Sequence, residues 1–559
     1  MKKIALQIIL LLMVVSCTQK NTYDIAYEIS HNTIDSIAEL RVKARFKPNS
    51  SGFTTLYFQN NAWGENDLFN CLSGLTLADN QGEIIKVPDS NRIEIKHAKD
   101  LDFLEFEYVL KQDTKLPLNT KKSYRPIIQP EYFSVFTHSL LMFPEVFLDQ
   151  ETINMKLNWK VSNNSHIVHN SFGSKLKEQV INTTPDKLLS AVFAGGDYRV
   201  HSFKIKNNDI HLATRGDWVA FEDSLVVNLL KKTIQVQREF WDDHSQEYFT
   251  VTMLPIPQEN GSSFQGTGLT NSFATTVSNN EFMQLEGLAY LFNHELLHNW
   301  IGHTIEKANE EEQYWFSEGF TDYYTNKNIA SNNILNLDAA FFIQQINEIV
   351  ALLYNSPVKN APNSEINYEN FWASRDYEKL PYRRGAVFAF YLDLKIAKDS
   401  QNKYNLDDLM NFFLKDAREK GQKIDHPYFV KATNNFLKED IKSFFETHLI
   451  NGSLFDLQSI YKEFDLDYDE FAEVFDRGFT ANMQTNTISD VIIDSNAYKA
   501  GLRKGDKITY MSVYSDAKKQ AEVGVMRDNK QIDIKFYPAR KIKVPQLIDN
   551  KKTRKNLPF

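Results

Sequence analysis

Hydrophobic and polar residues alternate along most of the stretch 23–201. The segments 38–44 and 103–109 show this pattern, and clusters of turn-forming residues such as 47–52 separate the alternating runs. Period-two alternation is typical of strands that bury one face and leave the other in solvent. We therefore predict an N-terminal β domain of sandwich type at residues 18–202.

The pattern changes to a helical period after residue 203. A strand-like run at 248–253 comes first, and segments with apolar residues at helical spacing follow it. These segments are 282–300, 315–328, 338–354, 384–398 and 406–420. Asn405 precedes the last of them and is a favourable N-cap residue. Residues 203–460 are therefore predicted to form a mixed domain, in which a small sheet is followed by a helical lobe.

Short strands with glycine-containing turns return at 466–538. Within them, residues 495–508 have the pattern of a short helix that ends at a glycine, a tight turn at 504–506 and a strand. This segment resembles the corresponding part of bacterial PDZ domains. The resemblance implies a PDZ-like domain at 461–545, which would bind a peptide or a protein C-terminus by strand addition. The tail at 546–559 is basic, and we expect it to be loosely held.

The first residues have the pattern of a secretion signal. Lys2 and Lys3 precede an apolar run at 4–15 that is too short to span a membrane as a helix. The run ends in Val-Val-Ser before Cys17, which resembles the lipobox of bacterial lipoproteins. The resemblance implies a signal peptide at 1–17, acylation of Cys17, and a lipid anchor in the bacterial cell envelope, on its periplasmic or surface side. The alternative is an ordinary signal peptide with a chance cysteine at its end.

The whole pattern predicts a multidomain α+β protein, and the composition agrees with it. The chain has 559 residues, of which 42% are hydrophobic, and this is enough for several cores. Once Cys17 is used, Cys71 is the one remaining thiol, so no internal disulfide is expected. The net charge of −9 argues against nucleic acid as a partner.

The candidate chemistry is concentrated in the helical segment 282–300. His294, Glu295 and His298 form the pattern His-Glu-x-x-His, and positions four residues apart lie on one face of a helix. Glu318 follows twenty residues after His298. Two imidazoles and one carboxylate leave one position of a tetrahedral zinc ion open to water, which is the arrangement of a catalytic site. We predict one Zn²⁺ bound by His294, His298 and Glu318.

The choice of Glu318 as third ligand depends on the residues after His298. The rival motif with a third histidine requires Gly at position 301 and His at position 304, where this chain has Ile301 and Thr304. Asp322 lies one helical turn after Glu318. It can hold a ligand histidine in the correct tautomer, or it is a solvated helix residue.

Glu295 has the position of a general base. A zinc ion lowers the pKa of a bound water to about 7 and polarises a carbonyl group. Glu295 can accept the proton of that water and pass it to a leaving amine, so the expected reaction is hydrolysis of a peptide bond. The alternative, a chance motif on a core helix, would bury polar groups without compensation.

The metal motif, together with the sequence Ser-Glu-Gly-Phe at 317–320, resembles the gluzincin metallopeptidases, the clan of aminopeptidase N. Residues 316–324 and the PDZ-like segment are most similar to the glycyl aminopeptidase family. The resemblance implies a thermolysin-like zinc peptidase domain at 203–460 that acts on peptides or proteins. It also implies that Tyr382 supplies a phenol that stabilises the oxyanion, with Arg384 where the clan usually has Lys. Otherwise Tyr382 is a core tyrosine.

One segment departs from the pattern of the clan. There, a strand before the zinc helix aligns the substrate and contains a Glu that binds the free amino group. Gly268, Leu269, Thr270 and Asn271 occupy that stretch here, and Thr270 replaces the Glu. Aminopeptidase-like cleavage and cleavage within a chain therefore both stay open. The rival function is that of a non-catalytic surface lipoprotein that binds peptides through a protease-like fold.

Overall fold

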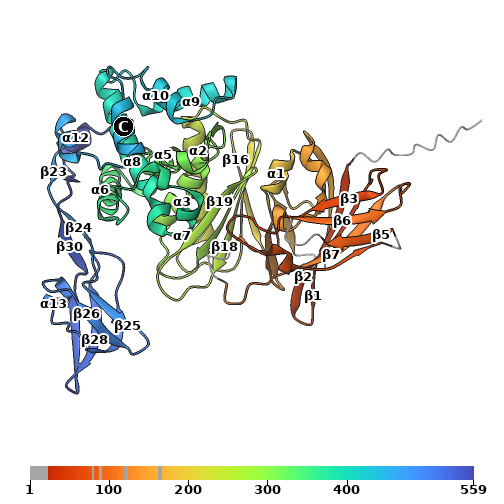
Figure 1. Ribbon diagram of the computed structural model, residues 1–559, viewed down its shortest axis with the longest axis horizontal. Helices are drawn as coiled ribbons and strands as arrows, with labels where there is room; N and C mark the ends of the chain where they lie inside the picture. The colour runs from red at the N-terminus through yellow and green to blue at the C-terminus, as the bar shows by residue number, and fades with distance from the viewer. Residues whose placement is uncertain (1–22, 79–80, 87–90, 119–123, 162–165) are drawn as a thin grey trace, which may run out of the picture. The chain divides into compact units, whose positions relative to one another are not determined.

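The computed structural model describes residues 23–78, 81–86, 91–118, 124–161 and 166–559 (Figure 1). The predicted signal peptide and Cys17 lie outside the described residues. Among the residues described, no helix is long and apolar enough to cross a bilayer. The chain divides into two compact units: one contains the residues up to Val219 and 246–282, and the other contains 220–245 and 283–559.

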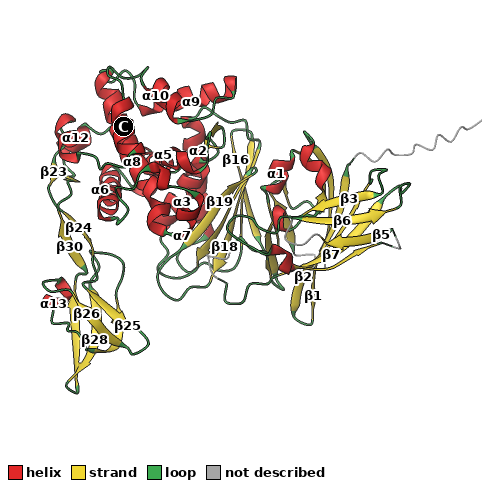
Figure 2. Cartoon of the chain, in the orientation of Figure 1, coloured by secondary structure: helices red, strands yellow, loops and turns green. Residues whose placement is uncertain are grey.

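The first unit is rich in strands (Figure 2). Its largest sheet contains, in spatial order, β14 (Glu178–Thr183), β11 (Ile153–Val161), β1 (Ile25–Ile34), β2 (Ile37–Phe46), β7 (Leu104–Lys111) and β4 (Leu72–Leu77). Buried and partly exposed residues alternate along β1 and β7, as the sequence predicts. Leu40, Val42 and Phe106 of this sheet belong to one hydrophobic core. The predicted sheet-rich N-terminal region is therefore confirmed.

Two smaller sheets complete the N-terminal region. One contains β10 (Phe143–Pro144), β3 (Phe53–Tyr57), β6 (Arg92–His97) and β5 (Gly82–Lys86). The other contains β13 (Gly173–Ser174), β12 (Ile167–Asn170), β15 (Val192–Gly196), β9 (Tyr132–Phe136) and β8 (Ile127–Ile128). A short helix, α1 (Pro185–Leu189), precedes β15.

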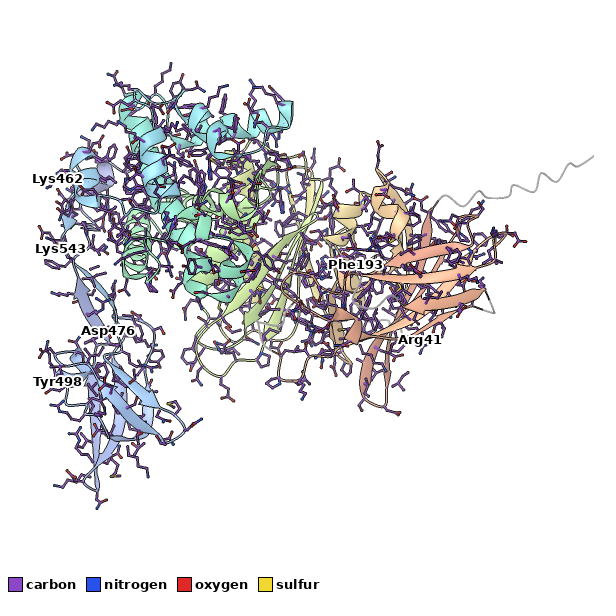
Figure 3. The ribbon with its side chains drawn as sticks, in the orientation of Figure 1. Arg41, Phe193, Lys462, Asp476, Tyr498 and Lys543 are labelled. Atoms are coloured by element: carbon purple, nitrogen blue, oxygen red, sulfur yellow. The ribbon has the colours of Figure 1, made fainter. Side chains whose placement is uncertain are left out.

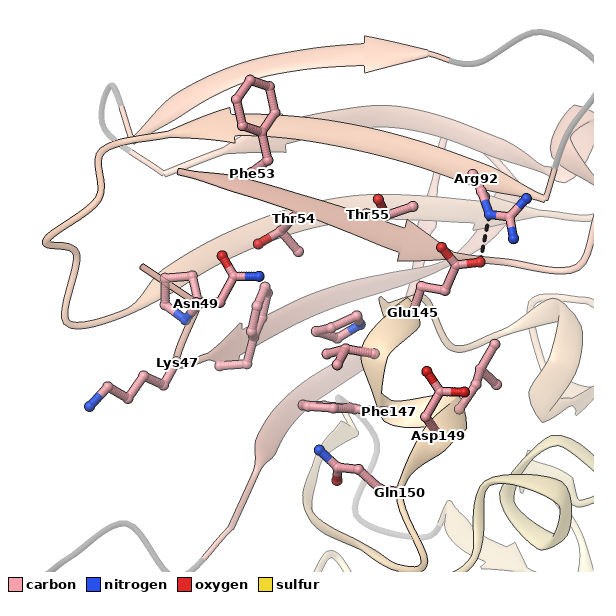
Figure 4. A pocket seen from close by; sticks show the side chains of 15 residues that line it. Lys47, Asn49, Phe53, Thr54, Thr55, Arg92, Glu145, Phe147, Asp149 and Gln150 are labelled. Carbon is pink, nitrogen blue, oxygen red and sulfur yellow. Dashed lines mark hydrogen bonds and ion pairs between the residues drawn. The ribbon is translucent and has the colours of Figure 1, made fainter. Parts of the chain in front are cut away.

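A groove of about 880 Å³ opens on the first of these two sheets (Figure 4). Arg92 of β6 forms an ion pair with Glu145 at its wall, and Phe53 is about half exposed. The one group of three potential metal ligands among the described residues lies elsewhere, in the second unit.

The last sheet of the first unit contains β16 (Arg199–Ile205), β17 (Asn208–Thr214), β18 (Tyr248–Ile256), β20 (Ser272–Ser278) and β19 (Phe264–Leu269), in that order. β17, β18 and β20 run parallel, whereas β19 is an antiparallel strand at the edge of the sheet. The predicted domain boundary at residue 203 falls inside β16.

The second unit is mainly helical. Its helices are α2 (Asp223–Phe240), α3 (Leu285–Leu297), α4 (Tyr314–Ser317), α5 (Gly319–Ser331), α6 (Ala339–Asn355), α7 (Tyr368–Ala373), α8 (Arg375–Asp399), α9 (Leu406–Lys420), α10 (His426–Thr433), α11 (Lys442–Phe445) and α12 (Leu457–Glu463). Aromatic rings dominate its core: Trp315 is fully buried and contacts Phe320, Phe388 and Phe429. The predicted helical C-terminal region is confirmed.

The predicted helices agree with the observed ones except in two places: the segment 315–328 is divided at Glu318 into α4 and α5, and the helix near residue 384 begins earlier. Helix α9 matches the prediction, and Asn405 forms a capping box with Asp408. Helix α8 begins at Arg375, nine residues before the predicted start at 384, and it contains Pro381. Proline usually interrupts a helix, so the sequence pattern concealed the first turns of α8.

The C-terminal residues form strands and a last helix. A sheet contains β25 (Phe479–Asn482), β26 (Thr487–Val491), β27 (Lys507–Ser512), β28 (Ala521–Arg527) and β29 (Lys530–Phe536), and α13 (Asn496–Lys499) lies between β26 and β27 in sequence. Two short ladders precede and follow it: β23 (Tyr468–Asp469) pairs with β31 (Gln546–Leu547), and β24 (Ala472–Phe475) pairs with β30 (Ala539–Ile542). Asp476, labelled in Figure 3, forms an ion pair with Arg540 after β24.

The expectation of a loosely held tail is wrong. Residues 551–555 form α14 (Lys551–Lys555), in which Thr553 is fully buried. Lys552 forms ion pairs with Asp465 and Asp467, and Arg554 forms one with Asp338 before α6. Two of the basic residues that suggested a solvated tail, Lys552 and Arg554, therefore pair with acidic residues that precede them by more than eighty positions.

Candidate metal centre

Helix α3 carries the two histidines of the motif on one face. His294 is buried in its last turn, and His298 is the residue that caps it. The Nε2 atoms of the two imidazoles lie 3.3 Å apart. Helical spacing brings the two side chains together, since residues four apart are neighbours on a helix surface.

Glu318 reaches the same point from the junction between α4 and α5. Its Oε2 atom lies 3.4 Å from Nε2 of His294 and 3.6 Å from Nε2 of His298. The predicted ligand atoms thus form a nearly equilateral triangle with sides of 3.3, 3.4 and 3.6 Å. In a tetrahedral zinc site, bonds of about 2.0 to 2.1 Å place neighbouring ligand atoms about 3.3 to 3.4 Å apart. The three side chains therefore fit one zinc ion.

Hydrogen bonds on the far side of each ring determine its orientation. Nδ1 of His298 lies 3.0 Å from the carbonyl oxygen of Ile301, which can only accept, so Nδ1 carries the proton. Nδ1 of His294 lies 2.9 Å from Oδ1 of Asp322 and donates in the same way. Both Nε2 lone pairs consequently point at the centre of the triangle, and such convergence is favourable when a cation lies there.

Asp322 lies on α5, within hydrogen-bond distance of His294. Its side chain is buried, with 8% of the residue exposed, and it is bonded to His294, so it is not a solvated helix residue. A carboxylate that accepts from a ligand imidazole fixes the tautomer and raises the basicity of that ligand.

The electrostatics of the triangle also favour a cation. Burial lowers the pKa of His294, but its bonds to Asp322 and Glu318 outweigh burial and raise this pKa to about 10. Burial raises the pKa of Glu318, yet the charge of His298 and the bonds from both imidazoles hold it well below its usual range. Either a proton or a divalent ion therefore compensates the negative charge gathered here.

Glu295 lies next to His294 in sequence and is half buried. Burial raises the pKa of its carboxyl group, against the charges of His294 and His298, which lower it. A carboxylate with a raised pKa beside the triangle is suited to accepting a proton and returning it.

Tyr382 belongs to α8 and lies at the side of the histidines. Its ring is parallel to that of His294, with an interplanar angle of 9° and centroids 6.1 Å apart. The ammonium group of Lys379 lies 4.2 Å from the Tyr382 centroid on the same helix. Burial, and then the negative charge of Glu318, raise the pKa of Tyr382 well above its ordinary value. The phenol therefore stays protonated and is available as a hydrogen-bond donor.

Arg384, two residues after Tyr382, is buried and donates to the carbonyl oxygens of Lys359 and Ala361.

Sequence reasoning missed Tyr290. Its hydroxyl group donates to Oδ1 of Asp322, the same oxygen that accepts from His294. A signal was present, because residues 290, 294 and 298 recur at intervals of four and share a face of α3. Without the position of Asp322, that spacing did not distinguish a partner from a core tyrosine.

The predicted substrate segment lies in the other compact unit. Gly268 and Leu269 end the edge strand β19, whereas Thr270 and Asn271 form the turn to β20, with Asn271 at φ 48°. The backbone N–H of Thr270 donates to Ser190, and its hydroxyl donates to the carbonyl oxygen of Lys187 at 2.8 Å. The hydroxyl of Thr270 is thus engaged with the backbone of α1, and the turn carries no acidic side chain.

Searches of protein-family models and of curated proteins find no match to this chain. Among solved structures, the crystal structure of an aminopeptidase N family protein from Idiomarina loihiensis is similar to it, with a TM-score of 0.71. The match covers 95% of this chain and 100% of that chain, with 17% sequence identity. At this identity the likeness shows the fold, which is that of an aminopeptidase N-like protein along nearly the whole chain.

Proposed function

We propose that this protein is a zinc-dependent metallopeptidase of the gluzincin type, in which His294, His298 and Glu318 hold one Zn²⁺. The observation that carries the proposal is the triangle of two Nε2 atoms and one carboxylate oxygen, with both imidazoles oriented by bonds on their Nδ1 atoms. The aminopeptidase N-like fold supports a peptidase rather than another zinc hydrolase.

The chain's own residues supply the acid–base chemistry. When bound, zinc lowers the pKa of water and polarises a carbonyl group. Glu295 takes the proton released by the attacking water and returns it to the leaving amine. Tyr382, kept neutral by its raised pKa, donates its hydroxyl hydrogen to the negative charge that develops on the carbonyl oxygen.

The proposed substrates are peptides or proteins, with cleavage of the aminopeptidase type. From the resemblance of its sequence, we propose that the segment 268–271 aligns an extended substrate by backbone hydrogen bonds. Thr270 carries no charge to pair with an α-ammonium group. We therefore expect selection for a free amino terminus to be weak.

The proposed peptidase domain is 203–460, following the N-terminal β domain at 18–202. We propose that the sheet within 461–545 is a PDZ-like domain that binds peptides or C-termini, and that Cys17 anchors the protein to the cell envelope by its lipid. The resemblances of residues 495–508 and of the segment ending at Cys17 support the PDZ-like domain and the lipid anchor.

Metal analysis of the purified protein, followed by digestion of a peptide library with and without a chelator, tests the proposed function. We expect about one zinc per chain, hydrolysis that stops when zinc is removed, and recovery when zinc is restored. Glu295→Gln should retain zinc and lose about 10²- to 10⁴-fold in kcat, because only the proton acceptor is changed. His298→Ala should lose both zinc and activity.

The rival function, a peptide-binding protein without catalysis, gives a different pattern. Such a protein would bind library peptides without cleaving them, and Glu295→Gln would bind them as the wild type does. Zinc-loaded protein that leaves the library intact would reject the peptidase.

A further inference from the structure

Tyr290 is linked to His294 directly through its ring and indirectly through Asp322. Its ring lies against the imidazole, with an interplanar angle of 27° and centroids 5.8 Å apart. Its hydroxyl donates to Oδ1 of Asp322, and that oxygen also accepts from Nδ1 of His294. The phenol, the carboxylate and the imidazole thus form one chain of hydrogen bonds behind the ligand triangle.

The hydrogen bond from Tyr290 restricts the orientation of the Asp322 carboxylate. With only the bond from His294, the carboxylate could rotate about its side-chain torsions and still accept one hydrogen. The hydroxyl of Tyr290 comes from the preceding turn of α3 and defines a second direction. Because Asp322 lies on α5, this bond also links the helix of the histidines to the helix that follows Glu318. Loss of the hydroxyl would leave a buried carboxylate short of one donor, a costly state.

We propose that Tyr290 is a positioning residue of the metal centre: it orients the Asp322 carboxylate, which in turn holds His294 with Nε2 toward the ion. The proposal rests on the function proposed above, because it requires that His294 be a metal ligand. Retention of zinc then depends on a hydroxyl group that acts through Asp322. Partners of this kind typically change metal affinity by about 10- to 100-fold.

The neighbouring helix offers a matched control. Tyr323 follows Asp322 directly in sequence, is fully buried, and donates its hydroxyl to Asp393 at 2.6 Å. Its ring packs on Phe342 instead of on a histidine. Tyr323→Phe therefore removes the same kind of phenol–carboxylate hydrogen bond in the same unit without changing the support of His294.

The experiment compares Tyr290→Phe and Tyr323→Phe in the full chain. Zinc affinity is measured by competition with a chromophoric chelator, and thermal unfolding is measured on the zinc-free proteins. We expect Tyr290→Phe to weaken zinc binding by about 10-fold or more, and Tyr323→Phe to leave it within about twofold. The zinc-free melting temperatures should fall by similar amounts in both variants, since each loses one hydrogen bond between a phenol and a carboxylate.

A double-mutant cycle with Asp322→Ala tests the route of the effect. If Tyr290 acts through Asp322, Tyr290→Phe should weaken zinc binding much less when Asp322 is already absent. Additive effects in the cycle, wild-type affinity in Tyr290→Phe, or an equal loss in Tyr323→Phe would overturn the proposal. A wild-type protein that binds no zinc would instead reject the metallopeptidase itself, so the two failures are distinguishable.

Discussion

Gly319 at the start of α5 and Gly385 in α8 touch so closely that neither has room for a side chain. A Cβ on Gly319 would lie 2.4 Å from Cα of Gly385, and a Cβ on Gly385 would lie 1.9 Å from the carbonyl oxygen of Trp315. Glu318 precedes the first glycine and Tyr382 lies three residues before the second. The close crossing of α5 and α8 therefore determines the distance between Glu318 and the phenol of Tyr382.

Gly385→Ala tests this relationship. Alanine normally stabilises a helix interior relative to glycine by about 1 kcal/mol, but here its methyl group would collide with backbone. We expect a destabilisation of about 3 kcal/mol or more, at the upper end of the cost of overpacking, and a fall in activity as α8 moves away. Thermal unfolding and kcat measure the two effects. A variant as stable and active as the wild type would show that the crossing is looser than the structure indicates.

Tyr382→Phe tests the role of the phenol. If its hydrogen bond forms mainly in the transition state, kcat should fall by about 10²- to 10³-fold while KM changes little. Tyr391→Phe is the control, because Tyr391 lies on the same helix but its ring stacks on Phe444, away from the histidines. Steady-state kinetics on one peptide substrate distinguish the roles: a loss confined to KM would reassign Tyr382 to substrate binding.

Because the turn at Thr270 has no acidic residue, we expect this protein also to cleave peptides whose amino terminus is acetylated. A carboxylate that binds an α-ammonium group contributes about 1.5 to 3 kcal/mol, which is roughly tenfold or more in kcat/KM. Because Thr270 supplies no charge, N-acetylation of a peptide should lower kcat/KM by less than about tenfold. Thr270→Val, which removes only the bond to Lys187, should leave this ratio unchanged. A large preference for the free amine would mean that another acidic residue has that role.

We expect Asp243 to make a contribution to stability that depends on pH. Its carboxylate accepts from Nε1 of Trp300, two residues after His298, and forms an ion pair with Arg418. Burial opposes its ionisation, but hydrogen bonds from Ser245 and Trp300 and the charge of Arg418 lower the pKa of Asp243 to about 2. A lowered pKa stabilises the fold above the unfolded value near 3.9, by about 2 kcal/mol, and this contribution is lost as the pH falls toward 2.

Asp243→Asn should therefore lower the melting temperature at pH 7, and the difference from wild type should narrow below pH 4. Melting curves of both proteins at pH 7, 5 and 3 measure the difference in melting temperature. Asp242→Asn is the matched control, because Asp242 is exposed and its backbone has φ 44°, a conformation that asparagine adopts readily. A constant difference across the pH range would mean that packing, not ionisation, makes Asp243 stabilising.

The sequence by itself determined the parts of the site that lie on one helix. His294, Glu295 and His298 are close because residues four apart share a helix face, and Asn405 capped α9 because capping needs only its neighbours. Local rules failed at Pro381, which is accommodated inside α8, and in the basic tail, where ion pairs with distant residues order α14.

The tertiary structure decided which of the distant candidates meet the histidines. Glu318 and Tyr382 depend on the contact of two glycines, and the bond of Tyr290 to Asp322 depends on the packing of α3 against α5. Spacing along the chain carries no information about such approaches, because they are set by side-chain volume and hydrogen bonding between helices. For that reason the metal motif could be recognised in the sequence, whereas the hydrogen bonds that orient its imidazoles could be identified only from the tertiary structure.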